Sequence, residues 1–144
     1  MTRGELIAFI RGHRLAVVAS TSAAGAAQAA VVGIAVTDAL ELVFDTLGST
    51  RKAANLRRDG RAALVIGWDD EQTVQLEGVA DEPGGDTLER LKRSYFVAHP
   101  DGPTRLGWSG LTYFRVRPTW ARYSDFRPGT ARVVELAGDA LSAG

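Results

Sequence analysis

Hydrophobic and polar positions along this chain alternate in short runs that are separated by turn residues. Runs of this length predict six or seven strands. The runs cover residues 15–20, 29–37, 41–44, 61–67, 73–81, 111–117 and 120–124. Asp38 and Ala39 leave only a tight link between the second and third runs, which is typical of antiparallel hairpins. Gly78 interrupts the alternation of its strand and predicts a β-bulge.

Three short stretches have helical spacing instead. Thr2 and Glu5 have the spacing of a capping box, which predicts a helix at the start of the chain. A second helix is predicted over residues 50–58, and a third in the stretch that ends before Pro100. Short helices between hairpin-linked strands predict a mainly β fold, an antiparallel β-barrel with short peripheral helices.

The length of 144 residues fits one domain. We expect a single domain over residues 1–136 and a frayed C-terminal tail over residues 137–144, because the tail is small and only weakly apolar. No window approaches the roughly 20 apolar residues that span a bilayer, and the N-terminus lacks the pattern of a secretory signal. The expectation is therefore a cytoplasmic protein without a membrane partner.

Composition narrows the possible chemistry. The chain has no cysteine, which excludes disulfides, thiolate metal sites and cysteine nucleophiles, so that any redox chemistry requires a cofactor. Its 17 basic and 17 acidic residues balance, which disfavours nucleic acid as a partner. His13 and His99 are the only histidines, and the acidic turn at 69–71 is typical of a solvated loop, so we predict no metal site.

One segment has the features of an anion site. Arg51 and Lys52 fall in the first turn of the second predicted helix, where the helix dipole is positive and disfavours cations. Free N–H groups, the hydroxyls of Ser49 and Thr50, and the two cations together predict a phosphate site, and Gly48 allows a sharp turn. The alternative is that Ser49 or Thr50 only caps the helix while the cations point into solvent.

The same segment resembles the pyridoxamine 5'-phosphate oxidase family. The resemblance rests on the strand 42–44, Thr46, the helix start 49–53 and the strand 61–68, which match the family in order and spacing. It implies an FMN-binding split barrel that forms a homodimer, with the cofactor in a groove between subunits. It also implies that Thr46, Thr50, Arg51 and Lys52 hold the phosphate of flavin mononucleotide (FMN).

The chain departs from the family at several positions. Residues 29–35 lack the family's arginine and lysine, and the glutamine that faces the flavin ring falls at Thr73, with Gln72 beside it. The resemblance places Tyr123 against the flavin, and Trp108 is the best tryptophan candidate for the groove because small residues flank it. No histidine follows Arg117, so the arginine and histidine pair that binds vitamin B6 phosphate is absent, and B6 oxidation is disfavoured.

The resulting hypothesis is a flavin-dependent oxidoreductase that acts on an unidentified small molecule. One alternative retains the fold with a deazaflavin coenzyme in place of FMN. A second is a noncatalytic flavin-binding or haem-binding protein, and a third is a dimerisation module without a ligand. The nature of the bound ligand separates these hypotheses.

Overall fold

The structure is a computed structural model, and it describes residues 1–142. Its strands are β1 (Leu15–Thr21), β2 (Ala27–Gly33), β3 (Ala35–Val36), β4 (Leu42–Leu47), β5 (Arg61–Ile66), β6 (Gln72–Asp81), β7 (Leu111–Asp125) and β8 (Arg132–Ala137). Its helices are α1 (Arg3–Arg11), α2 (Arg51–Arg58) and α3 (Gly85–Ala98), with 3-10 turns η1 (Gly102–Arg105) and η2 (Gly138–Ala140). The predicted fold class, mainly β with short peripheral helices, is confirmed.

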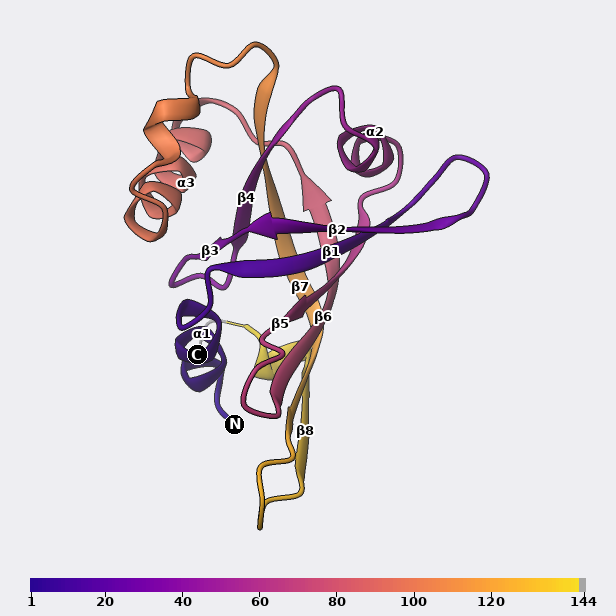
Figure 1. Cartoon of the computed structure of the whole chain (residues 1–144), viewed down its shortest axis with the longest axis vertical. Helices are drawn as coiled ribbons and strands as arrows, with labels where there is room; N and C mark the ends of the chain where they lie inside the picture. The colour runs from indigo at the N-terminus through magenta and orange to yellow at the C-terminus, as the bar shows by residue number, and fades with distance from the viewer. Residues whose placement is uncertain (143–144) are drawn as a thin grey trace.

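All the strands belong to one antiparallel sheet that curls into a split barrel (Figure 1). The strand order is β2-β1-β5-β6-β7-β4-β3, and β8 pairs with β7 outside this path. Helices α1 and α3 lie on one side of the curl, whereas α2 lies near β1 and β2 on the other (Figure 1). No helix in residues 1–142 is long and apolar enough to cross a membrane.

The strand boundaries differ from the prediction at two places. The run 29–37 divides into β2 and β3 because Ile34 uses its backbone elsewhere: its N–H donates to Arg14 and its carbonyl accepts from His99. The two expected strands after residue 111 are one continuous strand, β7. Register shifts between Glu77 and Gly78, opposite Thr119, so the predicted bulge at Gly78 is confirmed.

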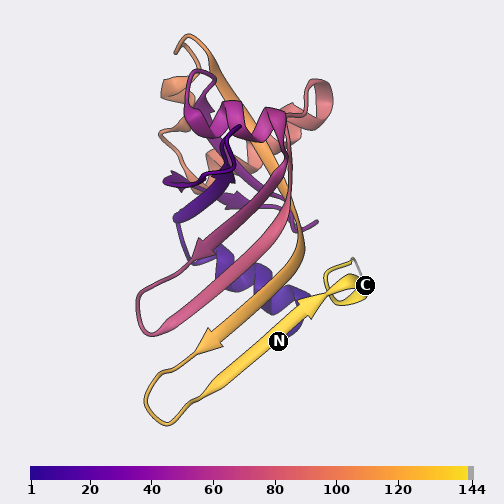
Figure 2. The same cartoon turned by 90° about the vertical axis from the view of Figure 1, so that its right-hand side faces the viewer.

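Strand β8 was not predicted, because its alternation is weak. It pairs with the last residues of β7, and the hairpin that they form projects from the barrel (Figure 2). The tail also differs from the frayed segment that we expected over 137–144. Residues 138–140 form η2, and Leu141 is only 9% exposed and packs against the core, whereas residues 143–144 lie outside the described part of the chain.

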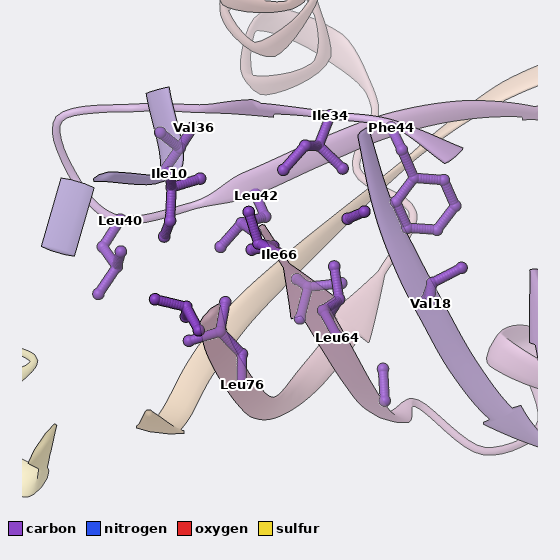
Figure 3. Close-up of a cluster of buried hydrophobic side chains, with 14 of the residues drawn as sticks. Ile10, Val18, Ile34, Val36, Leu40, Leu42, Phe44, Leu64, Ile66 and Leu76 are labelled. Carbon is purple, nitrogen blue, oxygen red and sulfur yellow. The ribbon is translucent and has the colours of Figure 1, made fainter. Parts of the chain in front are cut away.

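The main core lies inside the curl, where alternate residues of β1, β4, β5 and β6 meet (Figure 3). Val18, Phe44, Leu64 and Leu76 each expose 1% or less of their surface. Burial of such side chains contributes roughly 1.5–3 kcal/mol each, which makes the alternating pattern the main determinant of the sheet. A second cluster, which includes Tyr95 and its neighbours, packs beneath α3.

Candidate functional site

Strand β4 leads directly into the predicted phosphate segment. The turn after β4 is held by the Gly48 N–H, which donates to the Gly110 carbonyl at 2.7 Å. Thr50 then caps α2: its hydroxyl accepts from the Ala53 N–H at 3.3 Å and donates to the Leu47 carbonyl at 2.9 Å. Because the Thr50 proton is committed to this carbonyl, Thr46 is the donor in the 3.2 Å contact between the two hydroxyls. Both threonine hydroxyls therefore serve the turn.

A cavity of ≈ 320 Å³ lies between the start of α2 and the hairpin of β1 and β2. It is lined by Val18, Ser20, Gln28, Ala29, Ala30, Thr50, Arg51 and Lys52. None of these residues is acidic, and Ser20, Gln28, Arg51 and Lys52 all have hydrogen-bond donors. Of the predicted phosphate residues, Thr50, Arg51 and Lys52 therefore share one cavity, whereas Thr46 is buried beneath the turn and Ser49 is exposed.

Within the described part of the chain, the two cations of this cavity lack protein partners, whereas the cations later in the same helix have them. Arg57 pairs with Glu82 at 2.7 Å, and Arg58 donates to the Thr21 carbonyl. Among residues 1–142, Arg51 and Lys52 have no ion-pair partner, and the first turn of α2 contains no acidic residue. Two uncompensated cations at the positive end of a helix dipole create a strong local preference for an anion.

Sequence reasoning missed Asn55, which does not line this cavity but bonds two residues that do, Ser20 and Gln28. This side chain is 4% exposed, and its amide nitrogen donates to Ser20 Oγ at 3.0 Å and to Gln28 Oε1 at 2.8 Å. The sequence offered one signal: Asn55 is a polar residue next to Leu56, on the side of α2 that packs against the sheet. Its partners on β1 and β2 are 35 and 27 residues away, so only the fold brings them together.

The residues expected near the flavin ring lie elsewhere in the same subunit. Tyr123 donates to Gln72 Oε1 at 2.7 Å, and Thr73 pairs with Ser124 near the end of β7. Thr46, in contrast, pairs with Thr112 near the beginning of that strand. The two groups of predicted residues thus lie at opposite ends of β7, and one subunit does not bring them together.

Tyr123 lies mostly in the core. It is 6% exposed, and its ring meets Phe9 edge to face at 5.4 Å. Burial, with a contribution from the nearby Asp125 carboxylate, raises the pKa of the Tyr123 hydroxyl. In this subunit Tyr123 therefore presents little surface to a ligand.

Trp108 is on the surface between η1 and β7. Its side chain is 55% exposed and lines a second cavity of ≈ 200 Å³ with Lys92, Tyr113 and their neighbours. Gly110, whose carbonyl accepts from Gly48, lines the same cavity, so Trp108 lies beyond the predicted phosphate turn and does not line the cavity beside α2.

The two histidines occupy different environments. His99 is 4% exposed, its Nε2 is bonded to the Ile34 carbonyl at 2.7 Å, and its ring stacks on Tyr95. His13 is partly exposed, and its Nδ1 lies 2.8 Å from the Phe9 carbonyl. Within the described residues, no three His, Asp or Glu side chains cluster as metal ligands.

Comparisons with known proteins agree with this architecture. The family model described as pyridoxamine 5'-phosphate oxidase matches residues 2–125. No match is found among curated proteins.

Three solved structures are similar over most of this chain. A heme-binding protein from Mycobacterium smegmatis has 21% identity and a TM-score of 0.82 over 98% of this chain, which spans 60% of that protein. A Clostridium acetobutylicum protein related to general stress protein 26 of B. subtilis, of the pyridoxinephosphate oxidase family, has 15% identity and a TM-score of 0.71, with 96% of each chain covered. HutZ, the heme storage protein from Vibrio cholerae, has 13% identity and a TM-score of 0.70, with 80% of this chain and 88% of HutZ covered. At these identities the three structures share the fold.

Proposed function

We propose that this chain, which belongs to the pyridoxamine 5'-phosphate oxidase family, binds FMN with its phosphate in the cavity beside α2. The observation that carries the proposal is the pair of uncompensated cations, Arg51 and Lys52, in a cavity that has donors and no acidic group. A phosphate monoester has a charge of about −2 at neutral pH, so the two side chains neutralise it.

The chemistry of the proposed enzyme comes from the cofactor. A bound flavin supplies hydride transfer, so the protein needs no conspicuous pair of acid and base residues. Arg51 and Lys52 hold the phosphate, while Thr46 and Thr50 keep the turn in shape through their mutual hydrogen bond. The absence of histidine after Arg117 supports a small-molecule substrate other than vitamin B6 phosphate.

A second copy of the chain is the proposed partner. The outer face of β1, β2 and β5 has a row of valines, in which the half-buried Val17 pairs with the exposed Val31 on one side and the exposed Val65 on the other. Val31 is 60% exposed and Val65 is 37% exposed. Ala29 of the cavity lies two residues from Val31 on β2, so a subunit seated on this face would border the phosphate. A homodimer of this kind supplies the missing side of the groove.

The dimer is tested by a double substitution, Val31→Glu with Val65→Glu. We expect a monomer by light scattering, because two charges cannot be buried unpaired in an interface. Val97→Glu is the matched control, since Val97 is 84% exposed on α3, away from this face. A wild-type chain that is itself monomeric, or a double variant that remains dimeric, would refute the proposal.

Flavin binding is tested by ligand identification on protein from its native host, followed by titration of the purified chain with FMN. Arg51→Ala with Lys52→Ala removes two charge-assisted interactions of about 1.5–3 kcal/mol each, so we expect at least a 100-fold weaker Kd. Arg93→Ala on the exposed side of α3 is the control and leaves the Kd unchanged. FMN binding that ignores the loss of both cations contradicts the proposed site, and a deazaflavin bound in place of FMN reassigns the cofactor.

Turnover separates the oxidoreductase from a carrier. The flavin-loaded protein is mixed with reduced nicotinamide nucleotides and other electron donors, and bleaching of the flavin absorbance is followed. Reduction and reoxidation by a small molecule support the enzyme. A bound flavin that no donor reduces supports the noncatalytic alternative.

Haem is the second candidate, and His13 is the observation that favours it. A carbonyl only accepts, so His13 Nδ1 donates to the Phe9 carbonyl, and Nε2 is the ring nitrogen that has no hydrogen-bond partner among residues 1–142. His13 lines a cavity of ≈ 280 Å³ with Leu15 and Trp68, which are both about half exposed. The M. smegmatis protein of similar fold is described as heme-binding. The test is titration of the purified chain with haem. A Soret band that His13→Ala shifts or abolishes supports this candidate. A wild-type chain that gives no Soret band of bound haem, or a band that His13→Ala leaves unchanged, contradicts it.

A further inference from the structure

The cavity beside α2 is lined by the amide of Gln28, and hydrogen bonds through two other side chains set the orientation of this amide. The first of these side chains is Arg58, whose guanidinium nitrogen lies 3.5 Å from Asn55 Oδ1. Arginine has donors only, so the oxygen of the Asn55 amide is the atom that faces Arg58. The nitrogen of that amide is therefore on the opposite side, towards β1 and β2.

Asn55 in turn donates hydrogen bonds to one residue on each of the two strands. Its Nδ2 has two hydrogens, and one donates to Ser20 Oγ at 3.0 Å while the other donates to Gln28 Oε1 at 2.8 Å. Because the nitrogen cannot accept, Gln28 must turn its oxygen towards Asn55. Asn55 is 4% exposed, so water does not compete for these bonds.

The amide nitrogen of Gln28 remains available for a further hydrogen bond. The amide oxygen is engaged by Asn55, and Nε2 has no acceptor among residues 1–142. Gln28 lines the cavity together with Arg51 and Lys52, so this nitrogen is the group that is available to a ligand there. Ser20, which accepts from Asn55, likewise retains its hydroxyl proton for donation.

We propose that Gln28 Nε2 donates a hydrogen bond to the ligand phosphate and that Asn55, itself held by Arg58, is the positioning residue that keeps this donor turned into the cavity. The inference rests on the proposed function, because it assigns a phosphate to the cavity. It adds a neutral donor on β2, where sequence analysis found that residues 29–35 contain neither the arginine nor the lysine of the family. The two cations and this amide approach the phosphate from α2 and from β2.

The hydrogen bonds from Arg58 to Asn55 and from Asn55 to Gln28 form a relay, and the test reverses the direction of its last bond. Asn55→Asp retains the size of the side chain but replaces its donor with an acceptor, so Gln28 reverses its amide and presents Oε1 to the phosphate. We expect the Kd for FMN to rise about 10-fold to 100-fold, although residue 55 does not line the cavity. Gln28→Ala, which removes the donor on an edge strand, is expected to weaken FMN binding about 10-fold.

Riboflavin, which has the same ring without the phosphate, is the matched ligand. Both variants leave the Kd for riboflavin unchanged if the relay acts through the phosphate, whereas general damage to the fold weakens both ligands equally. The double variant Asn55→Asp with Gln28→Arg is expected to regain most of the FMN affinity, because the new cation pairs with the carboxylate and faces the phosphate. Thermal unfolding of each variant confirms that it folds, and Gln28→Ala carries the test alone if Asn55→Asp does not fold.

The outcomes separate the two proposals. If the wild-type chain binds FMN no better than riboflavin, the proposed phosphate site is wrong, and the proposed role of Gln28 and Asn55 is then wrong as well. If the wild type prefers FMN and loses this preference on Arg51→Ala with Lys52→Ala, but Gln28→Ala and Asn55→Asp retain the full preference, the phosphate site stands and the relay is wrong. A selective loss of FMN affinity in both relay variants supports the inference.

Discussion

Glu41 provides a sharp test of the energetics beneath α3. Its side chain is 8% exposed at the turn that begins β4, and its two oxygens accept from Arg90 at 2.7 and 3.0 Å. Arg115 donates to the same carboxylate at 3.0 Å, and Thr37 donates at 2.9 Å. These partners, Arg90 above all, lower the pKa of Glu41 from 4.5 to about 2 despite the opposing effect of burial.

This pKa shift fixes both the size and the pH range of the effect. Lowering the pKa of Glu41 from 4.5 to about 2 corresponds to about 3 kcal/mol, at 1.36 kcal/mol for each pH unit. Because the folded-state pKa is the lower one, the stabilisation is complete above the unfolded pKa of 4.5 and is lost as the pH falls through about 2. We therefore expect Glu41→Gln to lower the free energy of unfolding by about 3 kcal/mol at pH 7.

The measurement is urea unfolding of wild type and Glu41→Gln at several values from pH 7 to pH 2, followed by tryptophan fluorescence. The difference between the two proteins should shrink towards zero at the acid end, since the protonated wild type has lost the same interactions. Asp59→Asn is the control: Asp59 pairs with Arg61, whose side chain is 83% exposed, and solvent screens that pair. A difference below about 1 kcal/mol at pH 7, or one that persists unchanged at pH 2, would refute this account of Glu41.

Two further predictions concern the sheet and the cluster beneath α3. Gly78→Ala places a methyl group 2.5 Å from the Arg117 carbonyl, so β6 and β7 must separate, and we expect a loss of about 2–3 kcal/mol in chemical unfolding. Gly84→Ala, which meets nothing within 4 Å, is its control, and equal stability of the two variants would contradict the argument. Tyr95→Phe removes the 3.0 Å hydrogen bond to Asp45, and calorimetry should show a loss of about 1–2 kcal/mol, with a neutral result counting against this bond.

Local patterns in the sequence identified most of the elements. Short apolar runs between turn residues predicted β1, β4 and β5, and the alternation of apolar and polar residues predicted β6, because a side chain that faces the core recurs every second residue. The capping box at Thr2 and Glu5 is present in the structure, with both reciprocal hydrogen bonds. Gly78 signalled its bulge because the carbonyl of the neighbouring strand leaves no room for a Cβ atom.

Elements whose existence depends on a distant partner escaped prediction. The break at Ile34 comes from bonds to Arg14 and to His99, which is 65 residues away. β8 exists because β7 extends beyond the barrel and offers it an edge. Neither feature has a local signature, since both depend on hydrogen bonds between segments that only the fold brings together.

For the candidate site, the sequence identified the proposed phosphate turn and its two cations, because a helix start and the charges beside it are local properties. Only the tertiary structure decided what surrounds them. It set Ser20 and Gln28 against Asn55, and it left Tyr123 at the other end of β7 from Thr46. The physical reason is that periodicity and capping report a residue's immediate neighbours, whereas the walls of a cavity come from the pairing and curl of distant strands.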